Sequence, residues 1–210
     1  MRNFSSFPSK QPLPWPPAHA HSRRQRVGDW PLDDAQVVQF DALLHDIYPD
    51  APRVDADRLA QLSRWLMAMP EDEARSVLDE RLVRIEQLRS MVADPDWDCA
   101  EADRLRVQKL LGYLDQVDNL IPDRIPLLGK LDDIVLMELA WPALANEVDE
   151  YDDFSQYRAS ESPSGDGRER RATWIRERLA ALALLQHQQR INESRYAEGG
   201  RPVLPFRVGG

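Results

Sequence analysis

The spacing of apolar side chains predicts a series of helices that starts near Asp33. The first segment ends at Tyr48, before a proline, and Asp55 is then placed to cap a second helix. A third helix opens with acidic residues 71–73, which suit the electropositive first turn of a helix, and ends at Asp94. The apolar faces of the three helices are Val37, Phe40, Leu44 and Ile47, then Leu59, Leu62, Leu66 and Met69, then Leu78, Leu82, Ile85, Leu88 and Val92.

Two further helices are expected around a Pro-rich turn. The fourth runs from about residue 99 to residue 118, with Leu105, Leu111 and Leu114 facing inward. The fifth runs from Ile134 to about Glu150 with a kink at Pro142, because proline lacks the backbone donor that a helix interior needs. Asp132 or Asp133 is expected to cap it.

The two ends of the chain differ from this central part. Residues 1–30 are rich in Pro, Ser and Arg and lack a sustained apolar period. Residues 155–168 have the composition of a flexible linker, and a last helix from about Glu169 to Ser194 carries Ile175, Leu179 and Leu182 as its buried stripe. The sequence therefore predicts an all-α fold, an irregular bundle of five or six helices with an extended Pro-rich N-terminal arm. Its parts are a flexible arm (1–30), an acidic helical body (31–154), a linker (155–168), and a basic helix and tail that pack on the body (169–210).

Composition is typical of a soluble globular protein. The chain has 210 residues, 42% of them hydrophobic and 30% charged, which fits one domain with tails. Its single cysteine, Cys99, excludes an internal disulfide and Cys-Cys zinc patterns, so a reducing cytoplasm is the expected location. No apolar run approaches the roughly 20 residues of a membrane span.

Charge is divided unevenly along the chain, whose net charge is −9. Residues 1–26 carry 5 basic and 0 acidic side chains, residues 27–167 carry 13 and 32, and residues 168–210 carry 9 and 4. An acidic body makes a nucleic-acid partner unlikely, because phosphate contacts need clustered Lys and Arg on a folded surface.

The sequence 119–133, Asn-Leu-Ile-Pro-Asp-Arg-Ile-Pro-Leu-Leu-Gly-Lys-Leu-Asp-Asp, predicts a turn, since each proline disfavours helix at the preceding isoleucine. It resembles the central motif of the YkvA-like family, a bacterial domain of unknown function, over roughly residues 109–147. The motif residues are Asn119, Ile121, Pro122, Asp123, Ile125, Pro126, Gly129, Asp132 and Asp133.

The resemblance implies the turn geometry and supplies no catalytic residues. In many members of the family the motif lies in a hydrophobic hairpin associated with membranes. Here Arg124 and Lys130 replace aromatic or apolar residues, which favours a water-facing version, and Asn119 stands where an aspartate is usual.

Three carboxylates of the turn suggest two roles. Asp123, Asp132 and Asp133 could converge on a divalent cation, because Mg²⁺ and Ca²⁺ prefer carboxylate oxygens. The structural alternative is that Asp132 caps the following helix, Asp123 binds backbone amides of the turn and Glu138 faces a basic partner. No cofactor other than such a cation is expected.

Partner contacts are expected at the chain ends. Pro14, Trp15 and Pro17 could form a polyproline II segment that docks on a partner, or Trp15 could pack locally. Arg170 and Arg171 flank the last helix, which could dock on the body or contact an anionic membrane, such as the inner face of a bacterial inner membrane. The expected function is a non-catalytic protein-interaction or scaffolding module. The alternatives are a carboxylate-cluster metal enzyme and a peripheral membrane protein.

Overall fold

The structure, a computed structural model, is all-α, as the apolar spacing predicted. It describes residues 12–17, 26–117 and 119–199, with side chains up to residue 193. The described helices are α1 (Asp34–Ile47), α2 (Ala56–Met67), α3 (Glu71–Ala93), α4 (Glu101–Leu114), α5 (Leu131–Ala140), α6 (Ala145–Glu161) and α7 (Gly167–Gly199), with 3-10 turns η1 (Leu128–Lys130) and η2 (Trp141–Ala143). The chain divides into two compact units, residues 1–155 and 156–210, which are considered separately below.

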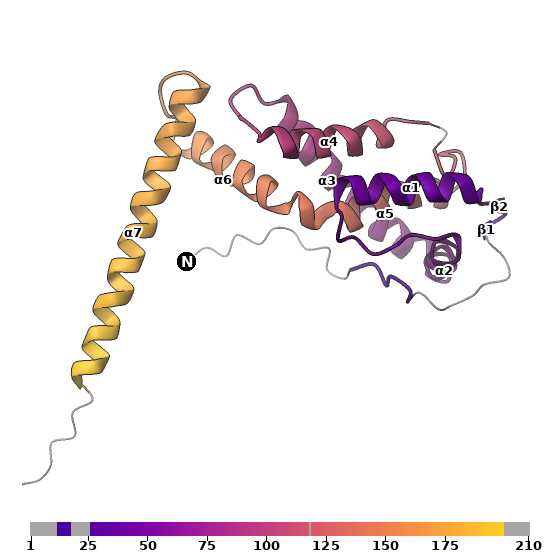
Figure 1. The fold of residues 1–210 in the computed structure, drawn as a ribbon, viewed down its shortest axis with the longest axis horizontal. Coiled ribbons are helices and arrows are strands. Elements are labelled where there is room, and N and C mark those ends of the chain that lie inside the picture. The colour runs from indigo at the N-terminus through magenta and orange to yellow at the C-terminus, as the bar shows by residue number, and fades with distance from the viewer. Residues whose placement is uncertain (1–11, 18–25, 118, 200–210) are drawn as a thin grey trace, which may run out of the picture. The chain divides into compact units, whose positions relative to one another are not determined.

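Helix α5 forms the centre of the first unit (Figure 1). It contacts α1, α3 and α4, and 9 of its 10 residues are buried. A helix that is buried on all sides needs apolar residues all round, and α5 has them in Ile134, Val135, Leu136 and Met137. The two aspartates at its start are therefore buried with it.

Helix α2 has its predicted Asp55 cap, and most of the predicted apolar positions of the first three helices are buried. The Asp33 side chain accepts a hydrogen bond from the backbone N–H of Ala35 at 2.7 Å, and Asp55 accepts one from Arg58 at 2.8 Å. Both satisfy donors that a helix N-terminus leaves unpaired. Of the predicted apolar faces, Val37, Phe40, Leu44, Ile47, Leu59, Leu62, Leu66, Leu78, Ile85 and Leu88 are buried.

The predicted face of the fourth helix is correct at Leu114, only half-buried at Leu111 and wrong at Leu105. Helix α4 ends at Leu114, and its buried residues are Val107, Leu110 and Leu114, while Leu105 is 50% exposed. Two overlapping stripes fit the same helical period, and leucine content pointed to the wrong one. Contacts with the neighbouring helices α1 and α3 decide that the side of α4 bearing Val107 is buried. These contacts cannot be read from the sequence of α4 alone.

The predicted fifth helix is two helices, because Pro142 breaks it. The turn η2 lies between α5 and α6, and proline at this position cannot donate the backbone hydrogen bond that would continue α5. Helix α6 then runs to Glu161, so the first half of the predicted linker 155–168 is helical. Only residues 162–166 connect α6 to α7.

Helix α7 begins with a capping box. The Asp166 side chain accepts from the backbone N–H of Glu169 at 2.9 Å, and Glu169 accepts from the N–H of Asp166 at 3.2 Å. The stripe expected to be buried in this helix is exposed: Ile175 by 41%, Leu179 by 61% and Leu182 by 48%. Among the helices of the described ranges, none combines the length and apolar character needed to cross a membrane.

The described part of the N-terminal arm is packed, which corrects the prediction of a flexible arm for these residues. Strands β1 (Arg26–Val27) and β2 (Trp30–Pro31) pair antiparallel around Gly28, whose φ of +58° suits glycine. Val27 is fully buried and Leu13 is 7% exposed. Residues 1–11 and 18–25 of the predicted arm lie outside the described residues.

Candidate functional site

The turn between α4 and α5 is held by a close backbone contact at Gly129. A Cβ atom at this position would lie 2.6 Å from the carbonyl oxygen of Asp123, so no side chain fits. The Gly129 N–H donates to the Ile125 carbonyl at 2.9 Å, and the Leu128 N–H donates to Pro126 at 2.7 Å. Leu127, between them, has φ 63° and ψ −42°, a tight three-residue turn that is rare outside glycine. The segment with Pro122, Pro126 and Gly129 thus forms a compact loop, in agreement with the predicted turn.

Asp132 joins this loop to α4. Its Oδ2 accepts a hydrogen bond from the Tyr113 hydroxyl at 2.7 Å and from the backbone N–H of Ile121 at 3.2 Å. The same hydroxyl accepts from the backbone N–H of Leu120 at 3.2 Å. One buried carboxylate therefore fixes both the end of α4 and the start of the loop.

Asp133, the next residue, faces a different set of groups. Its Oδ1 accepts from the side-chain amide of Asn119 at 3.1 Å, and its Oδ2 lies 3.2 Å from the ammonium of Lys130. Lys130 also donates to Asp123 at 2.8 Å. Asp123, Lys130 and Asp133 form a chain of charges that closes the loop upon α5.

Burial changes the acidity of this cluster. It raises the pKa of Asp132 to about 6, although the hydrogen bonds from Tyr113 and Ile121 oppose the shift. Burial also raises the pKa of Asp133 to about 7, with the Asp132 charge acting in the same direction and Lys130 against it. Burial and the neighbouring carboxylate raise the pKa of Tyr113, which keeps its hydroxyl a donor.

The structure does not bring the three carboxylates together as the predicted metal site. Within the described residues, no three His, Cys, Asp or Glu side chains are arranged to hold a metal ion. Asp132 and Asp133 are neighbours on a helix and project toward different partners, and Lys130 occupies one oxygen of Asp123. Three buried oxygens, Asn119 Oδ1, Asp123 Oδ1 and Asp132 Oδ1, accept no hydrogen bond from the described part of the chain.

The predicted caps at this loop are also different in the structure. Lys130 occupies the N-cap of α5 and makes no side-chain cap, while Asp132 and Asp133 lie in the first turn. Their charges are still suited to a helix N-terminus. Asp123 was expected to bind backbone amides, but its Oδ2 accepts a hydrogen bond from the Lys130 ammonium instead.

Glu138 does face a basic partner, within its own chain. Its Oε2 accepts from Arg81 Nε and from Arg84 Nη1, both at 3.2 Å. Arg81 is 2% exposed and Arg84 is 7% exposed, and the Arg84 guanidinium lies 4.6 Å from the centre of the Trp141 ring. The burial of these arginines of α3 could not be predicted, because arginine on a helix is usually a surface residue.

The N-terminal hairpin covers the loop. The Arg124 guanidinium lies 5.3 Å from the Trp30 ring centre, and a Cβ at Gly28 would lie 3.1 Å from Leu128 Cδ1. Arg124 is exposed, in line with the water-facing side expected from its charge. The sequence analysis did not predict that Trp30 contacts Arg124. The contact is known only from the folded structure.

The residues expected to contact partners have mixed surroundings. Pro14 and Pro17 are exposed, whereas Trp15 is half-buried and lies 6.0 Å from the Arg58 guanidinium, so it packs against α2 and not locally. The Trp15 N–H donates to Leu13 at 2.7 Å, which folds the segment tightly at Pro14 instead of extending it. Arg170 and Arg171 are half-buried in the second unit.

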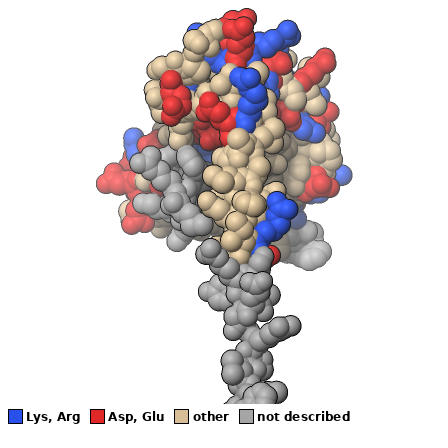
Figure 2. Space-filling model, turned by 90° about the vertical axis from the view of Figure 1, so that its left-hand side faces the viewer, with Lys and Arg blue, Asp and Glu red and all other residues tan. Residues whose placement is uncertain are grey.

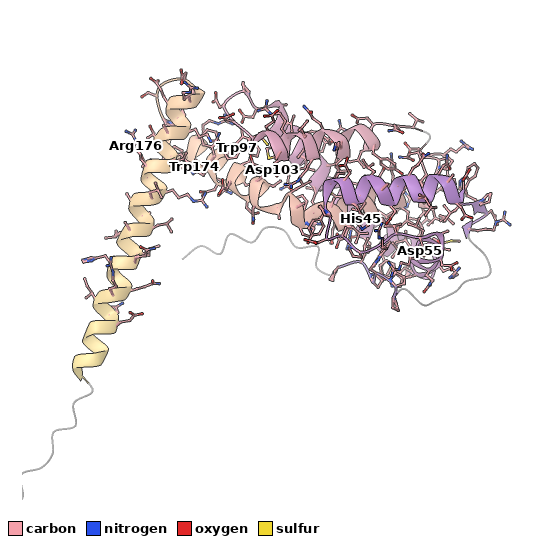
Figure 3. All side chains as sticks on the ribbon, viewed as in Figure 1. His45, Asp55, Trp97, Asp103, Trp174 and Arg176 are labelled. Carbon is pink, nitrogen blue, oxygen red and sulfur yellow. The ribbon has the colours of Figure 1, made fainter. Side chains whose placement is uncertain are left out.

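The start of α7 is shown with its side chains in Figure 3, where Trp174 and Arg176 are labelled. Trp174 is 5% exposed, the lowest value among the described side chains of α7, and Arg178 lies 5.3 Å from its ring centre. Within the second unit the Tyr157 hydroxyl donates to Glu177 at 3.3 Å. Beyond Trp174, the described side chains of α7 are all exposed.

Cys99 is buried near Glu147, which also contacts an aromatic cluster. Trp97, labelled in Figure 3, packs edge-on to Tyr151 and donates its indole N–H to Glu147 at 2.9 Å. Burial raises the pKa of the Cys99 thiol to about 12, so the thiol is not activated as a nucleophile.

No family model matches this chain, and neither the curated proteins nor the solved structures contain a match to it. The resemblance of residues 109–147 to the YkvA-like family therefore stays a prediction. The conclusions about function rest on the geometry of the molecule itself.

Proposed function

We propose that the protein is a non-catalytic protein-interaction module and that α7 is its binding element. The observation that carries this proposal is the exposure of five large apolar side chains within eleven residues of one helix. They are Ile175, Leu179, Leu182, Leu184 and Leu185, which are 41% to 61% exposed. Each square ångström of apolar surface removed from water stabilises an association by about 25 cal/mol, so a partner that covers this helix gains free energy.

The distribution of these side chains favours a protein partner over a membrane. Ile175, Leu179 and Leu182 share one face, because their spacings of four and three residues follow the helical period. Leu184 lies about half a turn away from that face. A helix in a membrane interface keeps its apolar side chains on one face, whereas a helix that packs among other helices can use two.

Figure 2 shows uncharged residues, polar as well as apolar, among Lys, Arg, Asp and Glu side chains on one face of the molecule. The apolar side chains of the binding element are identified by their exposed fractions and not by this view.

The loop between α4 and α5 fits this function as a structural element. The oxygens of Asp132 and Asp133 accept hydrogen bonds from Tyr113, Asn119 and the backbone of Ile121, all in the same chain. These contacts give the cluster a role in holding α4, the loop and α5 together.

The test is a face variant of α7, Ile175→Gln/Leu179→Gln/Leu182→Gln, beside a control that changes exposed polar residues of the same helix, Gln188→Ala/Gln189→Ala. Crosslinked affinity purification from the native host identifies candidates, and the dissociation constant is then measured with each purified candidate by calorimetry. We expect the face variant to weaken binding at least tenfold and the control to leave it unchanged, since hot-spot side chains dominate interfaces. Circular dichroism checks that both variants stay helical.

Equal binding by the wild type and the face variant would contradict the role of α7. Sedimentation of the wild type with anionic vesicles at low salt, lost in the face variant, would replace the protein partner with a membrane.

A further inference from the structure

The exposed side of α3 carries a shallow, open strip, called the α3 groove below. It consists of two adjoining depressions of about 430 Å³ and 420 Å³ that share Asp79 and Val83, and the second is lined by residues of α3 alone. The groove extends from Asp72 to Arg89, which at 1.5 Å per residue is about 25 Å along the helix. Its length therefore suits a helix of several turns.

The floor of the groove is apolar. Val83 is 60% exposed, Leu82 is half-buried, and Ile85 and Leu114 lie buried beside them. An exposed valine in the middle of a depression is a natural contact for an apolar side chain from another helix.

The rim of the groove is acidic. Its acidic residues are Asp72, Asp79, Glu80 and Glu86. The basic residues of the lining already have acidic partners. Arg75 pairs with Glu71, and Arg89 pairs with Asp115 and with Glu86 of the rim. Lys130 pairs with Asp123 and Asp133. The groove therefore attracts a basic apolar segment and repels an acidic one.

Helix α7 has the complementary character. Between residues 168 and 178 it carries five arginines and two glutamates, and its exposed apolar side chains continue to Leu185. Arg176 and Arg178 lie within the apolar stretch, so a helix placed in the groove brings both kinds of contact together. Each copy of the chain carries one α3 groove and one α7, so two copies supply a helix for each groove.

We propose that the occupant of the α3 groove is α7 of a second copy of the chain, and that two copies exchange their helices reciprocally. This inference rests on the proposed function of α7 as a binding element. Reciprocal exchange makes both contacts identical and closes the assembly as a dimer. It also doubles the buried surface of one helix in one groove toward the roughly 1,600 Å² typical of stable complexes.

Charge reversal tests the pairing. The groove variant Asp79→Arg/Glu80→Arg places a basic helix against a basic groove, and the helix variant Arg176→Glu/Arg178→Glu places an acidic helix against an acidic groove. A control, Asp50→Arg/Glu150→Arg, changes the net charge as the groove variant does but at exposed positions on other elements. Sedimentation velocity of the full-length chains at low salt gives the mass and the dissociation constant of the dimer.

We expect the wild type and the control to form dimers and each reversed variant to dissociate on the order of tenfold or more readily, because like charges replace opposite ones. Mixing the two reversed variants should restore a dimer, since each groove then meets a helix of opposite charge. Docking of α7 within one molecule cannot produce this rescue by mixing.

A wild type that stays monomeric at every concentration that keeps it in solution would overturn the second copy as occupant. So would dimers that survive both reversals, a mixture that forms no heterodimer, or masses that grow beyond a dimer. None of these outcomes affects the partner measurements with Ile175, Leu179 and Leu182, so a failure here and a failure of the proposed function are distinguishable.

Discussion

At the scale of single residues, Gly129 is fixed by a backbone contact and not by the local propensity of the turn. A methyl group there would overlap the carbonyl oxygen, carbon and Cα of Asp123, all closer than 3.0 Å. We expect Gly129→Ala to lower the free energy of unfolding by about 2–4 kcal/mol, because backbone atoms on both sides must move. Urea denaturation of the full-length protein measures the change.

Gly112 provides the matched control for this substitution. It lies within α4, and a Cβ there would meet nothing within 4 Å. Gly112→Ala is expected to be neutral or to stabilise the protein by up to about 1 kcal/mol, since alanine favours the helix. Equal effects at the two positions would show that the close contact at Gly129 is not rigid.

The acidity of Asp133 predicts how stability depends on pH. Its pKa of about 7 in the folded protein exceeds the value of about 3.9 for aspartate in an unfolded chain. Between these values the folded protein keeps a proton that the unfolded chain has released, so the free energy of unfolding falls as pH rises from about 4 to 7. Asp133→Asn removes this term, and the wild type should lose on the order of 3 kcal/mol more than the variant over the range.

Thermal or urea unfolding at several pH values between about 4 and 8 measures the difference. Asp50→Asn, at an exposed position, should keep the pH profile of the wild type. A wild type and an Asp133→Asn variant with parallel profiles would mean that the carboxylate is ionised throughout and that Lys130 outweighs its burial.

The sequence identified the aspartates of this cluster but not their surroundings. Asp132, Asp133 and Gly129 could be picked out because Pro and Gly fix the loop between them. Tyr113 could not, since its hydroxyl reaches Asp132 across 19 positions of the chain, and only the packing of α4 against α5 brings them together. A metal site was inferred from residue type alone, without the directions in which the side chains project.

At the scale of elements, a buried ion cluster ties α3 to α5. Glu138 of α5 holds the guanidinium groups of Arg81 and Arg84 together. Glu138→Gln would leave two buried cations near each other without that charge, and we expect it to cost about 3–5 kcal/mol of stability in urea denaturation.

Glu71→Gln is the control for this change. Glu71 pairs with Arg75 on the surface of α3, where both side chains are more than 60% exposed, so its loss should cost less than about 1 kcal/mol. If the two substitutions cost the same, water reaches Glu138 well enough to replace its charge.

The elements themselves could be predicted where local signals agree. In α1 the predicted stripe and stop are correct, and in α2 the predicted Asp55 cap is correct. In α4 two stripes were possible, and contacts with α1 and α3 decide between them. Residues 155–161 continue α6, although Ser155 and Ser160 suggested a linker. Phe154 and Tyr157, on either side of Ser155, continue the helical pattern of buried or half-buried aromatic side chains past the predicted start of the linker.

At the scale of the whole molecule, the two units differ in how much of their surface is buried. In the first, α5 is nearly all buried, whereas in the second the described side chains of α7 after Trp174 are exposed. Isolated helices are marginal in water, so the amides of α7 should exchange with solvent roughly a thousandfold faster than those of α5.

Hydrogen exchange followed by mass spectrometry tests this at a protein concentration low enough to prevent self-association. Protection of residues 180–193 at that dilution, equal to the protection of α5, would show that α7 is covered within a single molecule.

The uneven charge of the sequence predicted that the chain has acidic and basic surfaces. The position of the groove on α3 required the folded arrangement, since Leu114 and Lys130 reach it from other segments.

The buried cysteine, Cys99, reports when the first unit unfolds. Cys99 is 5% exposed and is the one thiol in the chain, so an alkylating reagent adds a single mass increment, and only after the first unit opens. The rate of alkylation therefore measures how often the first unit unfolds, without an attached probe and without purification. Applied to whole cells, it would rank the stability of the variants in the first unit in the environment where the protein works.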